Sequence, residues 1–132
     1  MSRVGPNLSR EEVAALVCDA LDRSGIEVVL SGGAAVCIYS DNEYESYDLD
    51  FIRTGLARKV DPVMQSLGFE KSGRHWKHPA SDFWVEFPPG PVQLGELVVT
   101  DFAERHTPVG TFRLLTPTDS VMDRLAGFYR AQ

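Results

Sequence analysis

Two aspartates, Asp48 and Asp50, are the residues whose type and spacing most clearly suit chemistry. They belong to the alternating segment Asp48-Leu49-Asp50-Phe51-Ile52, which predicts a β-strand. Strand residues two apart share a face, so we expect both carboxylates on one side and Leu49 and Phe51 in the core. Adjacent carboxylates repel each other unless a cation lies between them, and Mg²⁺ suits such a pair because it takes oxygen ligands and keeps positions for water or phosphate. The alternative is a solvated strand face that carries two acids.

A third acid, Glu86, lies in another predicted strand. In Phe83-Trp84-Val85-Glu86-Phe87 the alternation places Phe83, Val85 and Phe87 on one face and Glu86 with Trp84 on the other. An acid in so apolar a strand needs a partner such as a metal or a cation. The alternative is an edge-strand glutamate that faces water.

The third feature is the turn Ser31-Gly32-Gly33, which follows the β-branched run Ile26 to Leu30. Two glycines let the backbone approach a ligand closely, and the N-terminus of a following helix offers N–H groups to an anion. The alternative is an ordinary tight turn between a strand and a helix.

The elements that must position these residues follow from hydrophobic periodicity and capping signals. Ser9 and Glu12 form a predicted capping box, and a helix follows that ends near Gly25. A second capping signal, Thr116-Pro117-Thr118-Asp119, begins the last helix. Between them we expect strands at 26–30, 48–52, 74–78, 83–87, 96–100 and 111–115, a short helix at 34–39, and an amphipathic helix at 56–67 that Pro62 either splits or begins. The sequence therefore predicts a single α+β domain over residues 1–132, with one mixed β-sheet flanked by helices.

Composition narrows the class of protein. The 132 residues are 43% hydrophobic and 24% charged, which is typical of a globular chain and excludes wholesale disorder. The net charge of −6 disfavours binding to nucleic acid through bulk charge, so DNA is not an expected partner. Cys18 and Cys37 fit no zinc-ligand spacing, and no apolar run is long enough to span a bilayer. With two thiols and no secretory signal, we expect a cytoplasmic protein without a membrane partner.

The Gly-Gly turn, the short helix, the Asp48-Leu49-Asp50 strand and the later acid together resemble the nucleotidyltransferase fold of DNA polymerase β type. Minimal nucleotidyltransferases and the toxin-like branch related to the AbiEii abortive-infection proteins are the most similar groups. The resemblance covers residues 28–129 and includes the Pro-x-Asp start of the last helix, followed one turn later by Arg124. Two departures are that the third acid is Glu86 where Asp is commoner, and that the chain stops at Gln132 where relatives continue into more helix.

The resemblance implies transfer of a nucleoside monophosphate from an NTP, such as ATP, to a hydroxyl group of an RNA, a protein or a small molecule. Two Mg²⁺ ions would be held by Asp48 and Asp50, and Glu86 would complete the metal site and hold the attacking group. The nucleotide would be bound by Ser31, Gly32, Gly33 and Arg124.

Other functions stay open. A toxin-like protein with an antitoxin-like protein partner fits the resemblance, and so does a non-catalytic relative that keeps the fold as a binding module. An Asp-x-Asp motif also holds the metal of nucleotide-sugar glycosyltransferases, but 132 residues is short for that fold. His75 and His78 are three residues apart and should face opposite sides of a strand, which argues against a shared metal.

Overall fold

The computed structural model describes residues 4–5, 7–40, 47–53, 57–94 and 97–123. A further helical segment at 117–123 follows the last strand. The elements in chain order are α1 (Arg10–Arg23), β1 (Val28–Ser31), α2 (Gly32–Tyr39), β2 (Asp48–Arg53), α3 (Ala57–Ser66), β3 (Glu70–Ser72), β4 (His75–Lys77), β5 (Trp84–Glu86), β6 (Gln93–Leu94), β7 (Leu97–Val98), β8 (Ala103–Thr107) and β9 (Gly110–Leu114).

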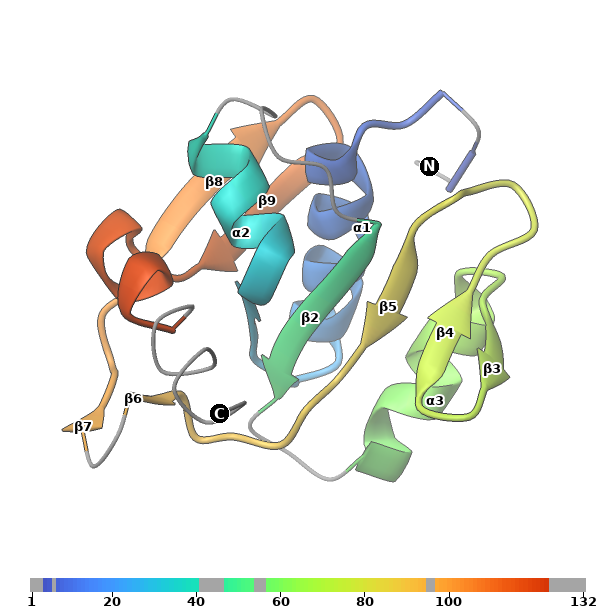
Figure 1. Cartoon of the computed structure of the whole chain (residues 1–132). Coiled ribbons are helices and arrows are strands. Elements are labelled where there is room, and N and C mark those ends of the chain that lie inside the picture. The colour runs from blue at the N-terminus through green and yellow to red at the C-terminus, as the bar shows by residue number, and fades with distance from the viewer. Residues whose placement is uncertain (1–3, 6, 41–46, 54–56, 95–96, 124–132) are drawn as a thin grey trace.

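Seven of the strands form one mixed sheet in the order β3-β4-β5-β2-β1-β9-β8. Two neighbouring pairs, β2 with β5 and β1 with β9, are parallel, and the other pairs are antiparallel. The short ribbon of β6 and β7 is a separate sheet that lies apart from the large one (Figure 1). The predicted α+β class with a mixed sheet and flanking helices is confirmed, and the second small sheet is an addition to it.

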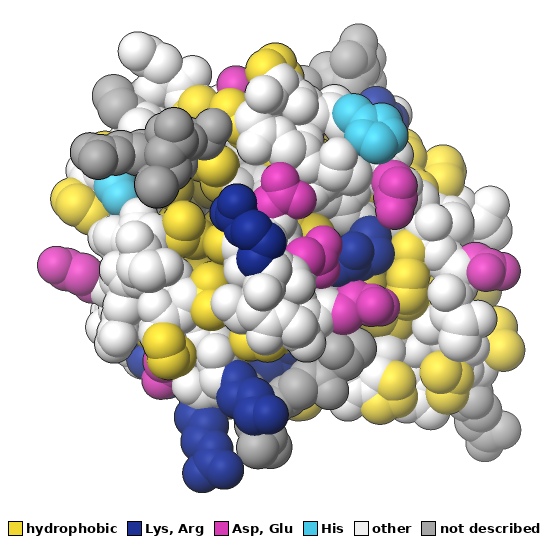
Figure 2. All heavy atoms as spheres, turned by 180° about the vertical axis from the view of Figure 1, so that it is seen from behind, with side chains coloured by type: hydrophobic (Ala, Val, Ile, Leu, Met, Phe, Trp, Pro, Cys, Tyr) yellow, Lys and Arg dark blue, Asp and Glu magenta, His cyan; other side chains and the backbone are white. Residues whose placement is uncertain are grey.

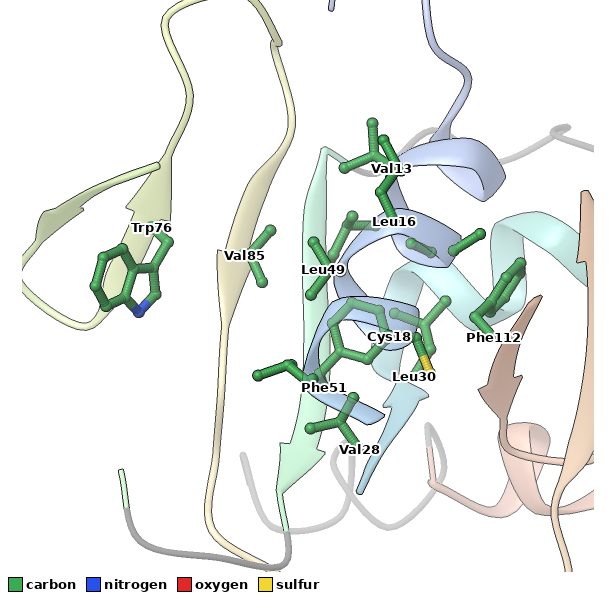
Figure 3. Close-up of a cluster of buried hydrophobic side chains, with 14 of the residues drawn as sticks. Val13, Leu16, Cys18, Val28, Leu30, Leu49, Phe51, Trp76, Val85 and Phe112 are labelled. Carbon is green, nitrogen blue, oxygen red and sulfur yellow. The ribbon is translucent and has the colours of Figure 1, made fainter. Parts of the chain in front are cut away.

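The main core lies on one face of the large sheet. Helix α1 packs on β9 and β1, and its apolar stripe joins Leu30, Leu49 and Phe51 in one buried cluster. Figure 3 shows Trp76, Val85 and Leu49 in a row on β4, β5 and β2, which agrees with their pairing across the strands. Because side chains alternate along a strand, the residues next to this row point to the opposite face.

Both predicted helix starts are present. The Ser9 hydroxyl accepts the Glu12 N–H and the Glu12 carboxylate accepts the Ser9 N–H, so the capping box is complete. At the other end of the chain the Thr116 hydroxyl accepts the Asp119 N–H, and the helical segment 117–123 begins at a proline. The two helices therefore begin where the capping signals of the sequence predict.

Several elements differ from the sequence-based expectation. Strands β3 and β8 were not predicted, because they are the two edges of the sheet and their mostly exposed, polar residues show no buried alternation. The strand expected at 96–100 is only the two-residue β7, which pairs with β6 and not with the large sheet. Pro62 neither splits nor begins α3 but lies inside it.

In the described part of the chain, no helix is long and apolar enough to cross a lipid bilayer. On the face seen in Figure 2, basic and acidic side chains lie close together near the centre. Charges of both signs are therefore mixed on this face of a chain whose net charge is −6.

Candidate active site

Strand β2 presents two carboxylates on the sheet face opposite the main core. Leu49 and Phe51 are fully buried, whereas Asp48 is exposed and Asp50 is half-buried. The alternation predicted from the sequence is therefore confirmed, with both aspartates on one side of one strand.

The strand register brings Glu86 beside Asp50. In the parallel pairing of β2 with β5, Asp50 is opposite Glu86 and Asp48 is opposite Trp84. On its other side, Asp50 is opposite Ser31 of β1, and Glu86 is opposite His75 of β4. A polar row therefore crosses four adjacent strands.

The turn after β1 meets this row at Asp50. Strand β1 ends at Ser31 and α2 begins at Gly32, so a strand ends and a helix begins at the predicted turn. The strand extends one residue beyond the expected 26–30, and the helix begins two residues before the expected 34–39. Gly32 has φ +67°, and a Cβ on it would lie 2.9 Å from the Asp50 Oδ2 atom. The Ser31 hydroxyl donates a hydrogen bond to the Asp50 carbonyl oxygen at 3.1 Å. Glycine is required at position 32 both for its left-handed backbone and for the space that the Asp50 carboxylate occupies.

A fourth acid, Asp123, was not predicted as a site residue. Its Oδ2 accepts a hydrogen bond from the Gly32 N–H at 3.2 Å, although 91 positions separate the two residues. A carboxylate from the last helix thus already occupies the N-terminus of α2, where the sequence predicted an anion. Its spacing four residues after Asp119 is the only sequence signal, and an exposed helix face explains that spacing equally well.

The electrostatics of the row centre on Asp50. Burial, followed by the carboxylates of Glu86 and Asp48, raises the pKa of Asp50 from 3.8 to about 6. Asp123 acts in the same direction, and His75 acts against it. A carboxyl group disfavoured in its charged form by three acidic neighbours is a good position for a cation.

Glu86 already has two positively chargeable neighbours. Arg74 Nε lies 3.7 Å from Glu86 Oε1, and His75 Nε2 lies 3.6 Å from Glu86 Oε2. His78 is elsewhere, with its ring 5.3 Å from that of Phe69 and its Nδ1 accepting the Ala80 N–H. The two histidines therefore do not meet, as expected, but His75 belongs to the site and the sequence did not indicate that.

The acidic side chains of the row suit a metal ion that takes only some of its ligands from the protein and the others from water or a substrate. Among the described residues, no three acidic, histidine or cysteine side chains converge tightly enough to hold a metal by themselves. Mg²⁺ does not need such a cage, because it is usually bound by one or two carboxylates together with water and substrate phosphates. Asp48 and Asp50 offer that pair on an accessible face. Arg124, predicted to bind the nucleotide, lies outside the described residues.

Comparison with known proteins places this geometry in context. No protein-family model and no curated protein sequence matches the chain. Its structure is similar to the crystal structure of an antigenic nucleotidyltransferase-like protein from Paracoccidioides brasiliensis, with a TM-score of 0.67 and 19% identity over 94% of this chain and 69% of that one. It is also similar to the solution structure of the antibiotic-resistance factor ANT(2'')-Ia, with a TM-score of 0.53 and 15% identity over 86% of this chain and 80% of that one. At these identities the likeness is one of fold.

Proposed function

We propose that this chain, which has the nucleotidyltransferase fold, transfers a nucleoside monophosphate from an NTP to a hydroxyl group of an acceptor. The observation that carries the proposal is the carboxylate row, in which Asp50 lies between Glu86 on one side and the Ser31-Gly32 turn on the other. The Gly-Gly turn and the later acid, two of the features that suggested this activity from the sequence, therefore both lie beside Asp50.

Asp48 and Asp50 would hold Mg²⁺ through carboxylate oxygens. When bound, Mg²⁺ neutralises the charge that develops on the transferred phosphoryl group and on the leaving pyrophosphate. The raised pKa of Asp50 fits this role, because a cation would relieve the repulsion from Glu86 and Asp48 that raises it. Two ions, as the resemblance implies, are part of the proposal.

Glu86 would receive the acceptor. Its place beside Asp50 in the register brings an acceptor hydroxyl bound at its carboxylate next to the phosphoryl group held at Asp50. Glu86 can accept the hydroxyl proton, and Arg74 and His75 on its two oxygens hold the carboxylate in position.

The triphosphate would bind at the turn between β1 and α2. Backbone N–H groups of Gly32 and Gly33 at the start of α2 suit phosphate oxygens, because the amide dipoles of a helix add up there. The Gly32 N–H is bonded to Asp123, so this carboxylate has to move aside when a phosphate binds. The Ser31 hydroxyl donates to the Asp50 carbonyl and helps to align the turn with β2.

The identity of the acceptor, a toxin-like role and an antitoxin-like partner stay predictions from the resemblance. ANT(2'')-Ia is described as an antibiotic-resistance factor, and a small-molecule hydroxyl is accordingly one acceptor to test.

The proposal is tested by label transfer. Each α-labelled NTP is incubated with Mg²⁺ and with separate RNA, protein and small-molecule fractions, and both labelled product and pyrophosphate are measured. The wild type should label one fraction and release pyrophosphate, Asp50→Asn should do neither, and Asp101→Asn, which changes an exposed aspartate outside the row, should behave as the wild type. Label transfer that survives Asp50→Asn, or none by the wild type in any fraction, would contradict the proposal.

A further inference from the structure

A cavity that Asp48 and Asp50 do not line lies between α3, the strands β2, β3, β4 and β5 and the chain that follows β5. It is a cavity of about 310 Å³ whose floor is apolar and whose rim carries three cationic side chains and two acidic ones, Asp61 and Glu86. The floor includes Val60, 1% exposed, and Trp76, 3% exposed, together with Phe87. The cations are Arg53, Lys71 and Arg74.

The cavity belongs to the face of the sheet opposite Asp48 and Asp50. Arg53 follows Leu49 and Phe51 at two-residue spacing in β2, and therefore points to their side. Lys71 is opposite Trp76 in the pairing of β3 with β4, and Trp76 is in turn opposite Val85. Only at its edge, through Arg74 and Glu86, does the cavity reach the carboxylate row.

The far wall of the cavity is fixed in place by backbone hydrogen bonds. The Arg53 N–H donates to the Pro88 carbonyl at 3.0 Å, and the Gly90 N–H donates to the Arg53 carbonyl at 2.7 Å. The Arg53 Nε also donates to the Phe87 carbonyl at 3.1 Å. The chain after β5 is thus held along β2, which fixes this wall of the cavity.

Lys71 and Arg74 at the rim keep bonding capacity for a ligand. Lys71 Nζ lies 3.7 Å from Asp61 Oδ2, and Arg74 Nε lies 3.7 Å from Glu86 Oε1. Both separations exceed hydrogen-bond length, so Asp61 and Glu86 do not use all the N–H groups of Lys71 and Arg74. Lys71 also lies over the Trp76 ring, with Nζ 5.7 Å from its centroid, which places a positive charge directly above an aromatic floor.

We propose that this cavity binds a small organic anion. Its carboxylate or phosphate group would be held by Lys71 and Arg74, and its apolar part would rest on Trp76 and Phe87. A site of this volume, with an apolar floor and a few convergent charged groups, has the composition of small-molecule sites in general. The rim carries three cations and two carboxylates, so its one excess positive charge disfavours a cationic ligand of similar size. The proposal does not use Asp48, Asp50 or a metal, and it shares only Arg74 and its partner Glu86 with the proposed active site.

Fluorescence of Trp76 tests the proposal directly. The chain has two tryptophans, so Trp84→Phe leaves Trp76 as the single reporter, on the floor of the cavity. This variant is titrated with phenyl phosphate, benzoate, benzyl alcohol and benzylamine, without metal or nucleotide. We expect saturable changes with the two anions at millimolar or lower concentration, and much weaker ones with the alcohol and the amine.

Variants that remove the same number of charges inside and outside the cavity distinguish binding in the cavity from general attraction of anions to surface cations. Lys71→Gln and Arg74→Gln, alone and together, should weaken phenyl phosphate binding, by about tenfold or more for the pair, because each removes a charge-assisted hydrogen bond. Arg58→Gln and Lys59→Gln remove exposed cations of α3 that do not line the cavity, and should change the affinity less than about twofold.

The proposal is overturned if no anion gives a saturable change, if benzylamine binds as well as phenyl phosphate, or if both pairs of variants have the same effect. Circular dichroism of every variant checks that the fold is kept, and amide chemical shifts of the wild type with phenyl phosphate give a second, variant-free map of the site. The fluorescence titration contains no metal or nucleotide, so its outcome does not depend on the outcome of the label-transfer assay.

Discussion

Replacing Asp50 with asparagine should stabilise the fold at neutral pH and at the same time remove a proposed metal ligand. Burial and the carboxylates of Glu86 and Asp48 raise the pKa of Asp50 to about 6, so its ionised form is disfavoured in the folded state. Asparagine has nearly the same shape and carries no charge. In many binding sites, like charges that repel each other destabilise the fold but are needed for function. Replacing such a residue then stabilises the protein and abolishes its function.

The structure also gives the size of the effect. The difference between the ordinary value of 3.8 and the value of about 6 corresponds to about 3 kcal/mol at a pH above both. Because the side chain is only half-buried, solvent screens part of the repulsion, and we expect a gain of about 1–2 kcal/mol in the free energy of unfolding.

The pH dependence has a definite sign. Between the two pKa values the folded protein binds more protons than the unfolded chain, so the wild type loses stability as the pH rises from 3.8 to about 6. The advantage of Asp50→Asn should therefore be largest above pH 6 and disappear near pH 4.

Urea unfolding followed by tryptophan fluorescence over this pH range measures the difference, with Asp101→Asn as the control for removal of an exposed charge. Added Mg²⁺ should stabilise the wild type more than Asp50→Asn. The reasoning is refuted if Asp50→Asn is less stable than the wild type above pH 6, or if its advantage does not change with pH.

The remaining predictions concern the turn, the last helix and the first helix. Gly32→Ala should cost about 1–2 kcal/mol of stability in thermal unfolding, because φ is +67° and the new Cβ would lie 2.9 Å from Asp50 Oδ2; an unchanged melting temperature would contradict this. Asp123→Asn should raise the affinity for an NTP several-fold in calorimetry, because it removes a negative charge from the N–H that a phosphate needs; an unchanged or lower affinity would contradict this. Ser9→Ala should lower the free energy of unfolding by about 1 kcal/mol in urea titrations, because the capping box of α1 is lost, and a change near zero would show that the cap contributes nothing.

Much of the fold was predictable because its signals are local. The capping residues Ser9 and Thr116 begin their helices as expected, and the alternation at Asp48 to Phe51 assigned each side chain to the correct face. Edge strands such as β8 were missed because an exposed strand has no buried side to produce alternation.

The composition of the site was only partly predictable, because its members meet through strand register and tertiary packing. Periodicity gives the face of Glu86 but not its neighbour, and only the parallel pairing of β2 with β5 places it opposite Asp50. His75 enters through the pairing of β4 with β5, and Asp123 through packing of the last helix against the turn. Neither contact has a sequence signature at short range.

The most direct test of the central claim is calorimetric titration of the wild type with each NTP, in the presence and absence of Mg²⁺. The carboxylate row predicts binding of at least one NTP that requires Mg²⁺, is abolished in Asp50→Asn and is retained in Asp101→Asn. Absence of Mg²⁺-dependent binding in the wild type, or binding of equal strength in Asp50→Asn, would contradict the assignment of Asp50 to a nucleotide and metal site.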